Sequence, residues 1–121
     1  MSTVLIVDND SSFRKALRKL LEQDGFDACI EARSAAEAIE RSKNVLPNLV
    51  ILDFSLPGRN GLRLAQELKA IMPRLPIFML TTDQTLNVEK EALSCGVDTV
   101  YSKFGALQPL LANAHAVVKN K

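Results

Sequence analysis

The feature that most constrains this chain is an alternation, repeated five times, between short apolar runs and segments with helical periodicity. Apolar residues three and four positions apart mark each helical segment. Short connections between alternating strands and helices predict right-handed crossovers and a parallel sheet. The strand-like runs lie at residues 4–7, 27–32, 49–52, 77–80 and 99–102, and the helical segments at about 13–21, 34–44, 64–72, 87–94 and 107–118.

Local signals support these boundaries. Residues 34–37, Ser-Ala-Ala-Glu, form a capping box at the start of the second helix, and Gly96 is expected to end the fourth. The first, third and fourth strand runs are apolar on both faces, as expected of strands that helices cover on each side. The apolar stripes include Leu20 in the first helix and Ile71 in the third. The predicted fold is an α/β, doubly wound, five-stranded parallel sheet with five helices.

Composition limits the class of protein. The chain has 121 residues, 47% of them hydrophobic and 24% charged, which suits one globular domain over residues 1–121. A formal net charge of +1 gives no overall attraction to nucleic acid or to an anionic membrane, so neither is an expected direct partner. Cys29 and Cys95 form no metal or redox motif, and no segment resembles a signal peptide or a membrane span. We therefore expect a cytoplasmic protein; whether it stands alone or is cut from a longer chain stays open.

Polar side chains follow the predicted strands where each strand ends. Asp8 follows the first strand, Asp53 and Ser55 the third, Thr81 the fourth and Lys103 the fifth. In open parallel sheets, ligands bind beyond the carboxyl ends of the strands. If the strand order is 2-1-3-4-5, the first and third strands are neighbours, and Asp8 and Asp53 face each other.

Two neighbouring carboxylates repel each other and need a cation nearby. A hard divalent ion with oxygen ligands is the natural choice, and Mg²⁺ suits a partly hydrated carboxylate site. Lys103 adds a fixed positive charge, and Thr81 adds a hydroxyl donor. Together these groups predict a site for a phosphoryl group.

Five sequence segments occur in order, each at its own strand end: Val7-Asp8-Asn9-Asp10, Leu52-Asp53-Phe54-Ser55-Leu56-Pro57-Gly58 with Gly61, Leu80-Thr81-Thr82, Gly96-Val97-Asp98 and Lys103. Together they resemble the response-regulator receiver family of bacterial two-component signalling. The resemblance covers essentially the whole chain and implies the flavodoxin-like receiver fold.

The resemblance implies that Asp53 accepts a phosphoryl group from a phosphohistidine on a sensor histidine kinase or a histidine phosphotransfer protein. It also implies that Asp8, Asn9, Asp53 and the backbone carbonyl of Ser55 hold Mg²⁺.

The remaining implications concern the phosphoryl group and the output. Lys103 and Thr81 would bind phosphoryl oxygens. The output would be a changed affinity for a partner, or for a second copy, through the face of the fourth helix, fifth strand and fifth helix. No turnover of an external substrate is expected, so the protein is not classed as an enzyme.

Three departures from the family pattern bear on metal binding and on switching. Asn9 replaces the usual second acid, which removes a negative charge and predicts weaker Mg²⁺ binding. Val100 occupies the usual position of a switch aromatic, and strand alternation points Tyr101 to the other face. Phe104 stands where the family often has proline, so we expect a trans bond before it. Asp10 is expected to cap the first helix.

These departures motivate an alternative hypothesis, in which the chain is a receiver-like interaction module that is phosphorylated poorly or not at all. A third hypothesis is an enzyme on a similar sheet. Phosphatases with an aspartyl nucleophile need a second acid two residues later, where this chain has Ser55. A flavin-binding relative would need a phosphate loop after the first strand, where the acids at residues 8 and 10 would repel phosphate. Both enzyme hypotheses fit poorly.

Overall fold

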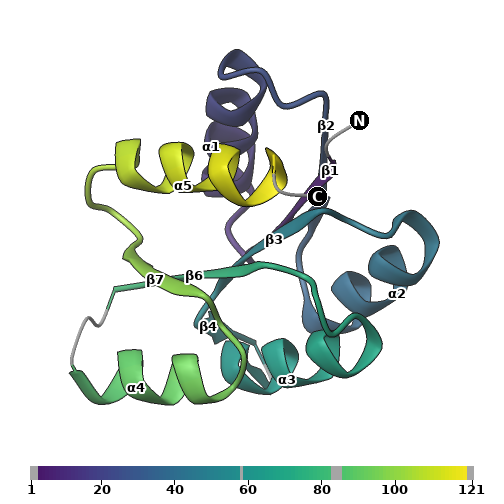
Figure 1. Ribbon diagram of the computed structural model, residues 1–121, viewed down its shortest axis with the longest axis vertical. Helices are drawn as coiled ribbons and strands as arrows, with labels where there is room; N and C mark the ends of the chain where they lie inside the picture. The colour runs from purple at the N-terminus through teal and green to yellow at the C-terminus, as the bar shows by residue number, and fades with distance from the viewer. Residues whose placement is uncertain (1–2, 58, 83–85, 120–121) are drawn as a thin grey trace.

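The computed structural model describes residues 3–57, 59–82 and 86–119, so Gly58 of the turn motif lies outside the described residues. Its main sheet has five parallel strands in the order β2-β1-β3-β6-β7 (Figure 1). Counted within this sheet alone, that order is the predicted 2-1-3-4-5. The strands are β1 (Thr3–Val7), β2 (Ala28–Ala32), β3 (Leu49–Asp53), β6 (Ile77–Thr81) and β7 (Thr99–Ser102).

Helices cover both faces of the sheet, as the prediction of a doubly wound fold requires (Figure 1). On one face lie α1 (Ser11–Gln23) and α5 (Gln108–Lys119), and on the other lie α2 (Ala35–Val45), α3 (Gly61–Ile71) and α4 (Leu86–Ser94). A small antiparallel pair, β4 (Ser55–Leu56) with β5 (Arg59–Asn60), was not predicted. Within the described ranges, no helix is long and apolar enough to cross a membrane.

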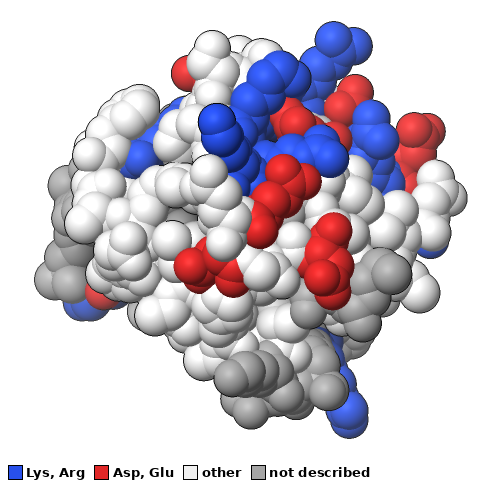
Figure 2. Space-filling view, turned by 90° about the horizontal axis from the view of Figure 1, so that it is seen from above, with Lys and Arg blue, Asp and Glu red and all other residues white. Residues whose placement is uncertain are grey.

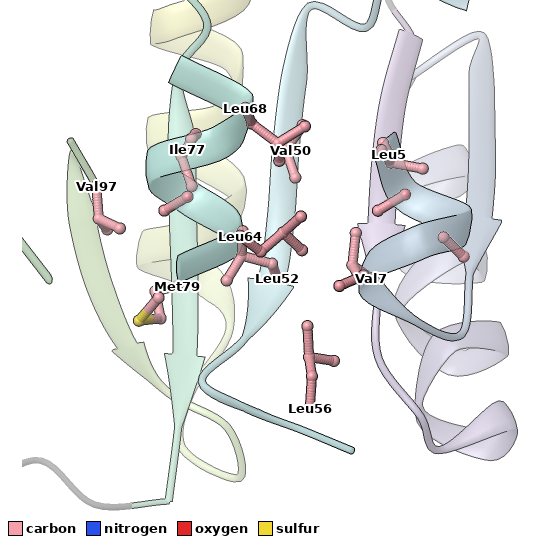
Figure 3. Packing of buried hydrophobic residues seen from close by; sticks show 14 of the residues in the cluster. Leu5, Val7, Val50, Leu52, Leu56, Leu64, Leu68, Ile77, Met79 and Val97 are labelled. Atoms are coloured by element: carbon pink, nitrogen blue, oxygen red, sulfur yellow. The ribbon is translucent and has the colours of Figure 1, made fainter. Parts of the chain in front are cut away.

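The core has two layers, one on each side of the sheet. Figure 3 shows the layer against α2 and α3, where side chains from the central strands meet Leu64 and Leu68 of α3. Every residue of β3 and β6 is buried, which confirms that strands apolar on both faces lie between two helical layers. The sequence prediction was wrong for Leu20 and Ile71, whose side chains are exposed. Both lie at the edge of an apolar stripe that is wider than the sheet surface its helix contacts.

Side-chain caps explain where two helices begin. The Ser34 hydroxyl accepts a hydrogen bond from the Glu37 amide at 3.2 Å, and Glu37 Oε1 accepts one from the Arg33 amide at 3.1 Å. The predicted capping box is therefore present, with Arg33 in place of the usual Ser34 amide. Asp10 accepts a hydrogen bond from the Ser12 amide at 2.9 Å, which confirms its predicted role as the cap of α1.

The end of α2 carries a strained residue. Leu46 has φ 57° and ψ 71°, in the left-handed region, and its side chain is 64% exposed. The left-handed conformation costs a residue with a Cβ about 1–2 kcal/mol, whereas glycine adopts it without this cost. After subtracting the greater freedom of glycine in the unfolded chain, Leu46→Gly is expected to raise the free energy of unfolding by about 0.5–1 kcal/mol.

Urea denaturation of the wild type, Leu46→Gly and Leu46→Ala tests this expectation. Leu46→Ala removes the same exposed side chain but keeps the Cβ, so it should give no gain. Equal stabilisation by both substitutions would show that the side chain, and not the backbone conformation, carries the strain.

Candidate functional site

The parallel pairing of β1 and β3 brings two acids together at the carboxyl edge of the sheet. Val7 pairs with Leu52, so Asp8 and Asp53 follow at equivalent positions on neighbouring strands. Both side chains are buried. Buried acids are rare unless they are paired with a cation or bind a metal, so this pair marks a site and not a surface.

Lys103 lies between the two acids. Its backbone amide donates a hydrogen bond to the Thr81 carbonyl at 2.9 Å, which fixes the end of β7 against the end of β6. Its Nζ lies 2.9 Å from Asp8 Oδ2 and 3.2 Å from Asp53 Oδ2. The structure therefore brings together Asp8, Asp53 and Lys103, with Thr81 buried at the same edge.

The remaining carboxylate oxygens contact the backbone of the adjoining turns. Asp8 Oδ1 accepts a hydrogen bond from the Asp10 amide at 2.8 Å, and Asp53 Oδ1 accepts a longer one from the Ser55 amide at 3.3 Å. Asp8 Oδ2 is buried and, among the described residues, accepts no hydrogen bond of good geometry, although Lys103 Nζ lies close to it. This oxygen keeps capacity for a second cation.

The charges of the site are coupled. Burial raises the pKa of Asp53, the charge of Asp8 raises it further, and Lys103 only partly offsets both effects. Burial lowers the pKa of Lys103, but the close contact with Asp8 and the charges of both acids raise it by more, so the net shift is upward. The site therefore favours a charged ammonium and disfavours two simultaneous carboxylates.

The donor set suits a hard divalent cation that keeps water ligands. Carboxylate oxygens of Asp8 and Asp53 are the ligand type that Mg²⁺ prefers, and the exposed Asn9 follows directly in the turn. Within residues 3–57, 59–82 and 86–119, no three His, Cys, Asp or Glu side chains form a metal-binding group. A cation here would have two carboxylates, and its other ligands would be neutral oxygens.

Gly61 allows α3 to begin against the backbone of Asp53. Its amide donates a hydrogen bond to the Phe54 carbonyl at 2.7 Å. A Cβ at this position would meet the Asp53 carbonyl oxygen at 2.5 Å and Leu52 Cδ1 at 2.8 Å. The family pattern includes Gly61, and close packing against the acid-bearing strand gives a physical reason for glycine at this position.

Arg14 supports the Asp8 turn, a role that was not predicted from the sequence. Its Nη1 donates a hydrogen bond to the Asp8 carbonyl at 2.6 Å, and its Nε contacts Glu31 Oε1 at 3.0 Å. Arg18 contacts the same glutamate at 3.2 Å. Figure 2 shows basic side chains gathered on part of one face of the molecule, with acidic side chains among them. Glu31 lies near Arg14 only because β1 pairs with β2, so no local sequence pattern could have predicted this ion pair.

Val100, Tyr101 and the peptide bond before Phe104 have the arrangement that the sequence predicted. Val100 packs against the layer under α3 and α4, whereas Tyr101 packs against the layer under α1 and α5. The Tyr101 hydroxyl accepts a hydrogen bond from Asn113 Nδ2 at 2.9 Å, so the ring is held on the α5 side. The peptide bonds of the described chain, including the one before Phe104, are trans. These observations confirm the predicted direction of Tyr101 and the predicted trans bond.

Comparison with known proteins gives consistent matches. Residues 4–115 match the family described as response regulator receiver domain. Response regulator MprA of Mycobacterium sp. (strain KMS) is 31% identical over 116 residues, or 96% of this chain and 50% of MprA. The phosphate regulon transcriptional regulatory protein PhoB of Pseudomonas aeruginosa is 32% identical over 119 residues, or 97% of this chain and 52% of PhoB. A two-component response regulator from Clostridium difficile superposes with a TM-score of 0.92 at 24% identity, covering 98% of this chain and 97% of that chain.

These matches differ in what they establish. The chain spans about half the length of the curated relatives it matches, so the comparison concerns the receiver part of those proteins. The solved structure, at 24% identity, establishes the fold. The family match covers almost the whole chain and includes every predicted site residue. The chain therefore belongs to the response regulator receiver domain family.

Proposed function

We propose that this receiver domain is a phosphorylation switch in which Asp53 accepts a phosphoryl group from a phosphohistidine. The donor is a sensor histidine kinase or a histidine phosphotransfer protein. The observation that carries the proposal is the Asp53 carboxylate, buried beside Asp8 with the Lys103 ammonium 3.2 Å away. A buried nucleophile with a fixed cation beside it suits the transfer of an anionic group.

In the proposed transfer, an Asp53 carboxylate oxygen forms a bond to phosphorus while the bond from phosphorus to the donor imidazole nitrogen breaks. The imidazole leaves with the electron pair and takes up a proton. Lys103, already in contact with Asp53 Oδ2, neutralises charge on a phosphoryl oxygen, and the Thr81 hydroxyl donates to another.

Mg²⁺ fits the same site. Its proposed ligands are Asp8, Asn9, Asp53 and the backbone carbonyl of Ser55, and when bound it supplies positive charge for the phosphoryl oxygens. Asp8 Oδ2, which is buried without a well-aligned hydrogen bond, supports this assignment.

The proposed output is a change in partner binding through the face formed by α4, β7 and α5. Phosphorylation adds charge next to Thr81 and shifts an existing equilibrium of this face, which changes its affinity for a protein partner or a second copy. Val100 has no ring that could rotate, and the Tyr101 hydroxyl accepts a hydrogen bond from Asn113 on the α5 side. The proposed coupling therefore acts through the β6 and β7 backbone and not through a rotating ring.

Exposure to acetyl phosphate with Mg²⁺, followed by intact mass measurement, tests the proposed acceptor. We expect the gain of one phosphoryl group, lost on standing and absent in Asp53→Asn. Asp27→Asn, in the exposed loop before β2, is the matched control and should still form the adduct. No adduct from either the small donor or a histidine kinase would favour the unphosphorylated interaction module.

Asn9→Asp is expected to bind Mg²⁺ about tenfold more tightly than the wild type, because it adds a third carboxylate to the ligand set. Calorimetric titration of both proteins measures the difference. Asn44→Asp adds the same charge to an exposed position on α2 and should leave the affinity unchanged. Equal affinities for the wild type and Asn9→Asp would show that position 9 is not a ligand.

A further inference from the structure

Phe104 is a large aromatic residue whose presence cannot be explained by a place in the hydrophobic core, because its side chain is exposed. Its side chain is 75% exposed, the highest value among the exposed large hydrophobic residues of the described chain. It directly follows Lys103, whose ammonium group contacts both acids of the site. The ring therefore lies in solvent, next to the one buried lysine that the described residues contain.

Two aromatic rings flank the Lys103 ammonium. Its Nζ lies 4.9 Å from the centroid of the Phe13 ring and 5.7 Å from that of the Phe104 ring. Both distances fall within the range of about 6 Å in which a ring face attracts a cation. The two rings also contact each other edge to face, with centroids 6.2 Å apart and planes at 85°, a favourable arrangement for aromatic pairs.

The backbone holds each ring in place. Phe104 lies in a tight turn after β7, in which the Gly105 amide donates a hydrogen bond to the Ser102 carbonyl at 3.3 Å. A Cβ at Gly105 would meet Ser102 Cβ at 3.0 Å, so a larger residue there would require Ser102 to shift slightly. Phe13 lies in the first turn of α1, and its amide is bonded to the capping Asp10.

We propose that Phe13 and Phe104 are positioning residues that hold the Lys103 ammonium between Asp8 and Asp53. Lysine carries its charge on a flexible four-carbon stem, so contact with the acids alone leaves the ammonium free to turn outward. The two rings cover its outer side and favour the inward conformation. This inference rests on the proposed function for its effect on phosphoryl transfer, but the contact itself exists in the unphosphorylated protein.

Three variants test whether the aromatic rings themselves hold the Lys103 ammonium, or whether any apolar side chain at these positions would do so. Phe104→Leu and Phe13→Leu keep an apolar side chain but remove the ring, whereas Phe104→Tyr keeps the ring. Leu46→Ala removes a similarly exposed apolar side chain at the opposite edge of the sheet and serves as the control. Phe104 is exposed, so its variants are expected to fold as the wild type does.

The first measurement is the ring-current shift of the Lys103 ε-methylene protons by NMR, in protein without donor or Mg²⁺. Each leucine variant should reduce this shift, and Phe104→Tyr should keep it. The second is the rate of adduct formation with acetyl phosphate. Phe104→Leu should slow it about two- to fivefold, and Phe104→Tyr should return it to within about twofold of the wild type.

The two measurements distinguish failure of this inference from failure of the proposed function. Unchanged lysine shifts in both leucine variants would overturn the inference, even if Asp53 is phosphorylated normally. Reduced shifts with an unchanged adduct rate would also overturn it, because the rings would then contact Lys103 without positioning it for transfer. If the wild type forms no adduct, the proposed function fails, and the shifts alone decide whether the rings hold the ammonium.

Discussion

Lys103→Met is expected to lower the free energy of unfolding at pH 7 by about 3 kcal/mol, the usual scale for removing one partner of a buried ion pair. The substitution keeps most of the side-chain length, so the main loss is the charge. The ammonium lies 2.9 Å and 3.2 Å from two buried carboxylates, and without it Asp8 and Asp53 repel each other. The stability lost in Lys103→Met should shrink as the pH falls through the raised folded pKa of Asp53. It should be smallest below the unfolded value of about 3.9, because protonation of the carboxyl removes the repulsion.

Urea denaturation in buffer with a metal chelator measures this effect without a compensating divalent ion. Lys15→Met, on the exposed face of α1, controls for loss of a lysine and should change stability by less than about 0.5 kcal/mol. Adding Asp53→Asn to Lys103→Met should recover a large part of the loss, because one of the two opposed charges is then gone. A loss no larger than that of Lys15→Met would show that Lys103 does not compensate the acids.

The fold was predictable because its signals are local. A strand buried on both faces is a continuous apolar run, so β1, β3 and β6 could be found without knowing their neighbours. The pair of β4 and β5 could not be predicted, because strands of two residues show no periodicity. Leu20 and Ile71 were misplaced because a stripe predicts which way a helix faces, but not how far its partner surface extends.

The candidate site was predictable only in part. Parallel strands end at one edge, so Asp8, Asp53, Thr81 and Lys103 could be placed together from their positions after each strand. The sequence did not predict that Lys103 contacts both acids at once, because that depends on the conformation of a long side chain. It also did not predict the contact of Arg14 with the Asp8 carbonyl, which depends on the pairing of β1 with β2.

Asp53→Asn is expected to raise the free energy of unfolding at pH 7 by about 1–2 kcal/mol, although it removes the proposed acceptor. Burial first, and the charge of Asp8 second, raise the pKa of Asp53 in the folded protein. The folded state therefore binds this proton more tightly than the unfolded chain does, and ionisation of Asp53 opposes folding. Lys103 still contacts Asp8 in the variant, so the substitution removes one of two like charges and leaves a single ion pair.

The pH dependence gives the sharper test. The stability contributed by the protonated Asp53 carboxyl is complete below its unfolded pKa of about 3.9 and is lost as the pH rises through the higher folded pKa. The gain from Asp53→Asn should thus be small at pH 3 and should grow through the acid range to a plateau. Urea denaturation from pH 3 to pH 8, with Asp27→Asn as the surface control, measures it. A gain that is already complete at pH 3 would have to come from packing, because the wild-type carboxyl is uncharged there. A gain that grows with pH would show that the charge of Asp53, the proposed acceptor, destabilises the folded protein.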